Sequence, residues 1–167
     1  DPGEPAAVVT TGVRQQGNPM ALDDARGVFP IAPTPFLDDG RIDAGSIDRL
    51  VDFYLGCGAT GVTVLGQLGE APKLEHAEST AIAAQVIRRA RGLPVIVGVS
   101  APGFAAMRAL TREVMEQGAA GVMIAPPNTL RTDDQIVAYY RQAAEAIGAD
   151  VPFVPPRPTW TPNLAMS

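Results

Sequence analysis

Short apolar runs alternate with longer amphipathic segments along most of this chain, and this alternation limits the possible folds more than any other sequence feature. The runs have roughly five residues each and a β-branched character, as buried parallel strands usually do. They lie at 28–34, 61–66, 94–100, 121–126 and 151–154, and the amphipathic segments lie at 43–56, 74–91, 103–117 and 132–147. The pattern predicts repeating strand–helix units and therefore a parallel α/β fold.

The predicted helices have an apolar stripe and recognisable ends. In the first, Ile47, Leu50 and Tyr54 recur at steps of three and four residues, which places them on one face of a helix. Asp43 and Thr132 stand where N-cap residues are expected. Glycines follow the last turns at positions 58, 92, 118 and 148, where a helix commonly ends.

Composition excludes several classes of function. The chain is 46% hydrophobic, enough for a core, and its 18 acidic residues outnumber 13 scattered basic ones, which argues against a nucleic-acid partner. No apolar run approaches the roughly 20 residues of a membrane helix, and no signal-peptide pattern opens the sequence. We therefore expect no membrane association and a cytoplasmic location. A single cysteine and a single histidine argue against an intrachain disulfide and a histidine-rich metal site.

The repeating pattern predicts one domain, at residues 20–154. Residues 1–19 are rich in Gly, Pro, Gln and Thr without periodicity and are expected to form a disordered leader. Residues 155–167 contain four prolines and are expected to form an irregular tail. Length alone favours an open five-stranded sheet, because a closed barrel typically has about 250 residues. The first loop nevertheless lacks the glycine-rich fingerprint of a dinucleotide-binding fold.

Four short motifs stand at the ends of the predicted strands. They are Thr34-Pro35-Phe36 with Asp39-Gly40, Gly66-Gln67-Leu68-Gly69-Glu70, the run Pro94 to Ala101, and Ala125-Pro126-Pro127. In this order and spacing, from about residue 27 to 154, the chain resembles the dihydrodipicolinate synthase and N-acetylneuraminate lyase family of barrel aldolases. The resemblance overrides the length argument and implies a partial (β/α)8 TIM barrel, about its first four and a half units, with parallel strands.

The resemblance also implies a chemistry. Members of this family are class I aldolases and lyases, in which a lysine near the end of the sixth strand forms a Schiff base with a pyruvate-like 2-keto acid. A loop with two threonines after the second strand holds the substrate carboxylate, and a tyrosine after the fourth strand relays protons. No metal or organic cofactor is required. A small-molecule 2-keto acid and a homo-oligomer are the expected partners.

On this chain the resemblance places the substrate-binding residues at Thr34 and at Gly66, Gln67, Leu68 and Gly69. Gln67 and Leu68 replace the two threonines, so both hydroxyls are lost. Backbone amides and the side-chain amide of Gln67 can still donate hydrogen bonds to a carboxylate, whereas Leu68 offers only an apolar contact. The loop is expected to bind a carboxylate with a changed specificity.

Two positions that carry the family's chemistry are altered. One transfers protons, and the other forms the covalent bond to the substrate. Asn128 stands at the tyrosine position, and an amide cannot replace a phenol as a proton relay. The sixth strand would lie beyond residue 167, so the Schiff-base lysine is absent. Lys73 is the only lysine, and at the entry of the second predicted helix it is expected to be a solvated surface residue. We therefore expect the isolated chain to be inactive.

Other polar residues near these motifs have simpler expected roles. Glu70 is expected to cap the second helix, because carboxylates are favoured near helix N-termini. Of Tyr139 and Tyr140, one is expected to pack inward and the other to face out, and neither to reach the catalytic rim.

Three interpretations remain open. In the first, the chain is a truncated or frame-shifted product of a lyase gene. In the second, it is a binding or structural module without catalytic activity that closes its half barrel by self-association. In the third, it is an active enzyme that uses Gln67, Asn128 and Glu70 in another mechanism.

Overall fold

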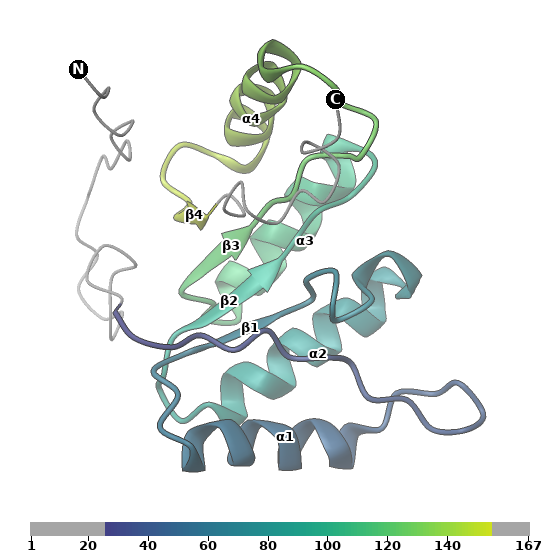
Figure 1. Ribbon diagram of the computed structural model, residues 1–167, viewed down its shortest axis with the longest axis vertical. Coiled ribbons are helices and arrows are strands. Elements are labelled where there is room, and N and C mark those ends of the chain that lie inside the picture. The colour runs from purple at the N-terminus through teal and green to yellow at the C-terminus, as the bar shows by residue number, and fades with distance from the viewer. Residues whose placement is uncertain (1–25, 155–167) are drawn as a thin grey trace.

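The computed structural model describes residues 26–154, and within them strands and helices alternate as predicted (Figure 1). In chain order the elements are α1 (Ala44–Gly56), β1 (Val62–Val64), the 3-10 helix η2 (Ala71–Lys73), α2 (His76–Arg89), β2 (Val95–Gly98), α3 (Phe104–Glu116), β3 (Gly121–Met123), α4 (Asp133–Ile147) and β4 (Phe153–Val154). The predicted leader at 1–19 and tail at 155–167 lie outside the described residues, as do positions 20–25.

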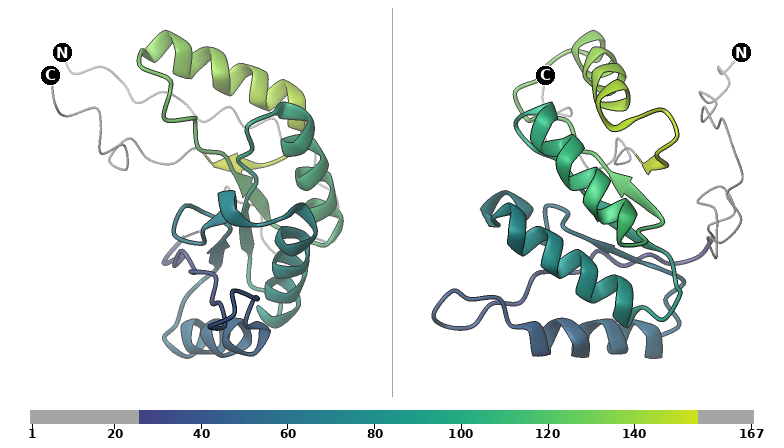
Figure 2. Two further views of the ribbon diagram at one scale, coloured as in Figure 1. Left: turned by 90° about the vertical axis from the view of Figure 1, so that its right-hand side faces the viewer. Right: turned by 180° about the vertical axis from the view of Figure 1, so that it is seen from behind.

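The strands form one parallel sheet in the order β1-β2-β3-β4, so the predicted parallel α/β architecture is confirmed. The four α-helices lie in an arc around one face of this sheet (Figure 2). No helix between residues 26 and 154 is long and apolar enough to cross a bilayer.

The first predicted strand, at 28–34, is only partly formed. Ile31 makes a single parallel bridge to Thr63 of β1, with Ala32 N–H donating to the Thr63 carbonyl at 2.8 Å. Pro30 and Pro33 have no amide proton, so a full ladder cannot form here. The segment therefore lies parallel beside β1 without being a regular strand.

The second helix begins two residues later than predicted, and Glu70 does not cap it. Residues 71–73 form η2, and α2 starts at His76 with Glu75 as N-cap, whose amide donates to the Glu78 carboxylate at 2.9 Å. Glu70 instead precedes η2 with a left-handed φ of 54°. The proline at position 72 favours the start of the short turn, and this separates Glu70 from the helix.

The core lies between the sheet and the helices. Val64, Val97 and Val122 occupy paired positions on successive strands and are at most 2% exposed. The helices cover them with buried side chains that include Val51, Val86, Met107, Val114 and Ala143. Of the stripe predicted for the first helix, Ile47 is buried and Leu50 and Tyr54 are partly buried. Burial of these apolar side chains provides the main stabilisation of the fold.

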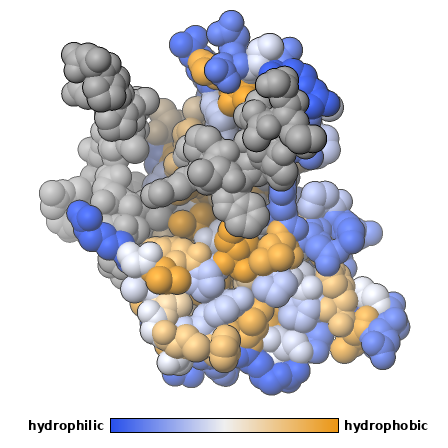
Figure 3. Space-filling view, in the orientation of Figure 1, coloured by the Kyte–Doolittle hydropathy of each residue, from blue (hydrophilic) through white to orange (hydrophobic). Residues whose placement is uncertain are grey.

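The opposite face of the sheet carries the alternate strand residues. The register pairs Ile31 with Thr63, Thr63 with Ile96, and Gly98 with Met123, and side chains of neighbouring strand positions point to opposite faces. None of the four helices described above covers this face, and a cluster of apolar residues is visible on its exposed part (Figure 3). In a closed barrel this face would point to the interior.

The carboxyl ends of β1 and β2 approach each other unusually closely. A Cβ atom built on Gly98 would overlap the carbonyl oxygen of Leu65. Leu65 is buried and has a left-handed φ of 57°, which turns the chain across the end of β2. The absence of a side chain at position 98 therefore positions the loop that follows β1.

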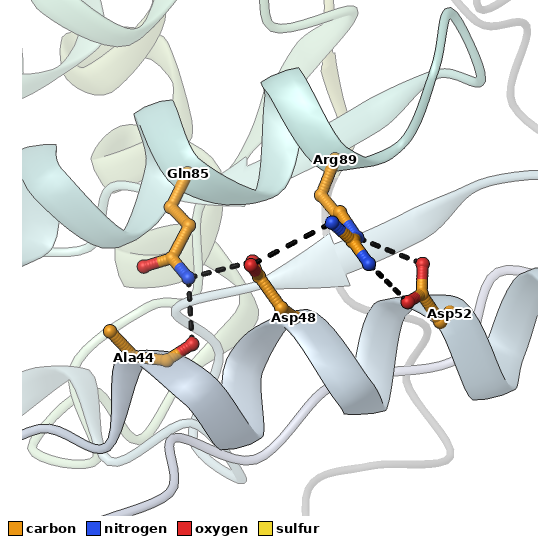
Figure 4. A network of polar contacts seen from close by, with 5 residues as sticks. All are labelled: Ala44, Asp48, Asp52, Gln85 and Arg89. Atoms are coloured by element: carbon orange, nitrogen blue, oxygen red, sulfur yellow. Dashed lines mark hydrogen bonds and ion pairs between the residues drawn. The ribbon is translucent and has the colours of Figure 1, made fainter.

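A polar network links α1 to α2 on the outer surface (Figure 4). The Arg89 guanidinium donates to Asp52, with Nε 2.8 Å from Oδ1, and its Nη1 lies 3.8 Å from Asp48 Oδ2. Gln85 Nε2 donates to Asp48 Oδ1 at 2.8 Å and to the Ala44 carbonyl at 2.7 Å. The hydrogen bond from Arg89 lowers the pKa of Asp52 below its ordinary value.

This lowered pKa predicts loss of stability in acid. A carboxyl whose pKa is lower in the folded than in the unfolded state stabilises the fold above its unfolded pKa, and this contribution is lost as pH falls through the folded pKa. We expect the urea midpoint to fall between about pH 5 and pH 3, and to fall less steeply in Asp52→Asn. Asp38→Asn, at an exposed position with no ion pair among the described residues, is the control. If the urea midpoint fell equally steeply with pH in both variants, the acid sensitivity would not come from Asp52.

A second prediction concerns Gly98. Gly98→Ala forces the Leu65 backbone away from β2, and we expect a loss of about 1–3 kcal/mol in the free energy of unfolding, as overpacking typically costs. The control is Gly56→Ala, at the last residue of α1, where an added Cβ meets nothing within 4 Å and where alanine favours the helix. Urea unfolding measures both, and an unchanged midpoint for Gly98→Ala would show that the strand ends are not tightly packed.

Candidate functional site

The candidate site lies at the carboxyl ends of the parallel strands. The loop at 66–70 follows β1, and the loop at 125–130 follows β3. Because parallel strands end at the same edge and β2 alone separates β1 from β3, the two loops start roughly 10 Å apart.

The loop at 66–70 is a compact turn. The Gly69 amide donates to the Gly66 carbonyl and the Glu70 amide to the Gln67 carbonyl, each at 3.0 Å. Gly66 and Gly69 are buried, while Gln67 and Leu68 are exposed. Within residues 26–154, the amides of Gln67 and Leu68 have no hydrogen-bond acceptor. Two adjacent donors therefore stand at the tip of the turn.

Thr34 holds this loop in place. Its side chain is 8% exposed, and Oγ1 donates to the Gly69 carbonyl at 2.7 Å across 35 residues of sequence. The hydroxyl proton is thus used within the protein. A direct contact between Thr34 and a substrate stays a prediction, and the observed contact is a structural support for the loop.

The loop also packs tightly against the sheet. A Cβ built on Gly66 would lie 3.1 Å from Met123 Cε and 3.3 Å from Ile31 Cγ2. One built on Gly69 would lie 3.1 Å from the Leu65 amide nitrogen. Small residues at both positions therefore allow the turn to sit directly on the strand ends.

The end of β3 is fixed by side chains from two other elements. Ser100 Oγ accepts a hydrogen bond from the Ala125 amide at 2.8 Å. From α4, the hydroxyl of Tyr139 donates to the Ala125 carbonyl at 3.3 Å and that of Tyr140 to the Ile124 carbonyl at 3.2 Å. Asn128 follows on an exposed part of the loop. The predicted tyrosine-position residue thus lies on an anchored segment.

The expectation for the two tyrosines is wrong. Both are partly buried and both reach the backbone at the carboxyl end of β3, so neither simply faces out. Desolvation raises the pKa of Tyr140 to about 12, and the phenol donates its proton in the hydrogen bond to the Ile124 carbonyl. Helical spacing did not reveal this role, because adjacent helix positions usually point about 100° apart.

Lys73 has the exposed position that the sequence predicts. Its side chain is 74% exposed, and Nζ forms an ion pair with the Glu70 carboxylate. Lys73 is not buried among apolar side chains, the setting that would favour a nucleophilic amine. Glu70 contributes its carboxylate to this surface pair.

Two hollows lie elsewhere in the described part of the chain. An open polar one of about 390 Å³ lies between α1 and α2 and is lined by Ala44, Asp48, Gln85, Arg88 and Arg89. An apolar space beneath Thr34, bordered by α1 and α2, has a volume of about 10 Å³, which is room for no more than one water. Between residues 26 and 154 no group of three or more His, Cys, Asp or Glu side chains is placed to hold a metal ion.

The chain is similar to several known proteins in sequence and in structure. The chain is 32% identical over 135 residues to the 4-hydroxy-tetrahydrodipicolinate synthase of Thiobacillus denitrificans, covering 80% of this chain and 45% of that protein. It is also similar in structure to dihydrodipicolinate synthase from Rhodopseudomonas palustris, with a TM-score of 0.75, 67% identity, and coverage of 78% of this chain and 44% of that one.

A third similar structure is the prophage protein YagE of E. coli K12 in complex with pyruvate, with a TM-score of 0.67, 26% identity, and coverage of 78% of this chain and 45% of that one. This chain therefore spans less than half the length of these relatives. The likeness confirms the predicted partial (β/α)8 barrel. Since residues 24–154 match the profile of the Dihydrodipicolinate synthetase family, the chain belongs to that family.

Proposed function

We propose that the loop at 66–70 binds the carboxylate of a pyruvate-like 2-keto acid as part of a Schiff-base-forming lyase or aldolase site. The observation that carries this proposal is the pair of amide donors of Gln67 and Leu68, presented on a turn that Thr34 holds. Family membership supports the substrate class, as does the pyruvate complex of YagE.

The substituted side chains define what this loop contributes. The exposed side-chain amide of Gln67 supplies a further donor beside the two backbone amides. Leu68 is 59% exposed and provides an apolar contact in place of a hydroxyl. The loop therefore holds the carboxylate through amide groups in place of the two hydroxyl groups of the family.

The covalent step needs an amine that these residues do not contain. In the proposed reaction a lysine amine attacks the keto carbon, water leaves, and the protonated imine then accepts electrons as a carbon–carbon bond forms or breaks. Lys73 is the only lysine and is paired with Glu70 at the surface. Asn128 can orient the substrate through its amide but transfers no proton. We therefore propose that the isolated chain is catalytically inactive; its cytoplasmic location stays a prediction.

Reductive trapping tests the assignment of Lys73. When the chain is incubated with pyruvate and sodium borohydride, we expect no covalent adduct on Lys73 by peptide mass spectrometry, because a solvated ammonium is a poor nucleophile. A family member with an intact lysine, treated in parallel, verifies the reagent. A pyruvate adduct on Lys73 would overturn the assignment.

Carboxylate binding is tested without catalysis. On titration with pyruvate, we expect amide NMR shifts at Gln67 and Leu68, with Gly92 and Gly148 unchanged. Thr34→Val removes the hydrogen bond to Gly69 and is expected to weaken these shifts and to cost about 1 kcal/mol of stability.

Thr111→Val is the matched control for that variant. Thr111 is 2% exposed, and its Oγ1 has no partner in the described part of the chain, so its replacement is expected to be neutral or stabilising. Amide shifts absent from 66–70, or equal effects of the two valine variants on binding, would contradict the proposed role of the loop.

A further inference from the structure

The hydroxyl of Ser100 lies just beyond the carboxyl end of β2, between the two loops of the candidate site. The strands that precede those loops, β1 and β3, are the two neighbours of β2 in the sheet. Extending the register that pairs Gly98 with Met123 by two residues places Ser100 opposite Ala125. Each loop therefore starts one strand spacing, about 5 Å, from Ser100.

Ser100 lies on the face of the sheet that the helices leave uncovered. Val97 and Val99 are both 0% exposed and belong to the core between the sheet and the helices. Because side chains alternate between the two faces of a strand, Gly98 and Ser100 belong to the opposite face. A Cβ built on Gly98 would overlap the Leu65 carbonyl oxygen, so the chain that leaves β1 crosses β2 on this same face. The carboxylate loop of the proposed function therefore begins beside Ser100.

The Ser100 hydroxyl is held through its oxygen and keeps its proton. Oγ accepts a hydrogen bond from the Ala125 amide at 2.8 Å. A serine hydroxyl also has one proton to donate. No hydrogen bond in which Ser100 donates joins it to another residue of the part of the chain that the structure describes, and the residue is exposed. The Ala125 amide thus fixes the oxygen and leaves a donor for a ligand.

Other hydroxyl groups that contact the strand ends use their protons within the protein. Thr34 donates to the Gly69 carbonyl, and Tyr139 and Tyr140 donate to carbonyls at the end of β3. If one of these three hydroxyls turned to a ligand, it would leave a backbone carbonyl without its partner, which costs free energy. Ser100 can donate to a ligand without that cost.

We propose that Ser100 is a specificity-determining residue, whose hydroxyl donates to the keto oxygen of the bound 2-keto acid. This inference rests on the proposed function, which assigns the carboxylate of that acid to the amides of Gln67 and Leu68. In a 2-keto acid the keto carbon is bonded directly to the carboxylate carbon, so a donor to the keto oxygen must lie close to the carboxylate site. Ser100 meets this requirement because it follows the strand next to β1. The hydroxyl then selects 2-keto acids over carboxylic acids that have no keto group.

A pair of ligands tests this selection. Pyruvate and propionate have the same carbon skeleton and the same carboxylate, but only pyruvate has a keto oxygen. In NMR titrations we expect both acids to shift the amides at 66–70, and pyruvate to bind about fivefold more tightly, as one added hydrogen bond typically gives. The Ala125 amide, which donates to Ser100 Oγ, should shift with pyruvate and not with propionate.

Substitution of Ser100 separates donation to the ligand from support of the loop after β3. Ser100→Ala is expected to lower the ratio of the pyruvate and propionate affinities about fivefold, whereas Ser100→Thr retains the hydroxyl and should retain the ratio. A role limited to holding the Ala125 amide would weaken binding of both acids equally. Circular dichroism verifies that the variants keep their helices.

Thr60→Ala is the matched control variant. The Thr60 hydroxyl is also hydrogen-bonded to the backbone, donating to the Val28 carbonyl at 3.1 Å, but it precedes β1 and so lies at the opposite edge of the sheet. Its removal should leave the affinity ratio unchanged.

The possible results distinguish this inference from the proposed function. Amide shifts at 66–70 with both acids, together with an affinity ratio that Ser100→Ala leaves unchanged, would overturn the role of Ser100 and leave the carboxylate site in place. Absence of shifts at 66–70 with either acid would contradict the proposed function, and the role of Ser100 with it. A ratio that falls in Ser100→Ala and is retained in Ser100→Thr would support both.

Discussion

Parallel pairing of short strands is the constraint on which the rest of this structure depends. Parallel strands need long crossovers, and each crossover here contains a helix. Because the strands pair in sequence order and such crossovers are right-handed, all four helices lie on one face and the carboxyl ends of the strands lie at one edge. The loops at 66–70 and 125–130 are neighbours only because their strands run in the same direction. The close approach of Leu65 to Gly98 then sets the position of the first loop on that edge.

Much of this fold follows from local sequence signals. Helical spacing and caps such as Asp43 and Thr132 predicted the four helices to within a few residues, and the side-chain oxygens of both residues accept capping hydrogen bonds from backbone amides. The segment at 28–34 did not become a full strand, because Pro30 and Pro33 lack donors, although its composition is β-branched. The role of Glu70 was wrongly predicted because a 3-10 turn intervenes, which the backbone preference of Pro72 favours and which charge does not indicate.

The candidate site was predictable only in part, for a related reason. The motif at 66–70 marks the loop, and the sequence alone shows that both hydroxyl groups of the family's loop are lost. The contact of Thr34 with Gly69 joins residues 35 apart, and the two tyrosine hydroxyls reach carbonyls 14 and 16 residues away. Such contacts follow from tertiary packing, which periodicity along the chain does not encode. Similarity to the family indicated the chemistry, and the structure revealed the hydrogen bonds that hold the two loops in place.

The hydrogen bond from Thr34 to Gly69 has one more consequence. Thr34 belongs to the same segment as Ile31, which forms an outer border of the sheet, so the turn that presents the Gln67 and Leu68 amides is tied directly to that border. Any change in how tightly the border is held must alter the freedom of the turn. The conformation of the turn and the seating of the first segment on the sheet are therefore linked through a single hydroxyl group.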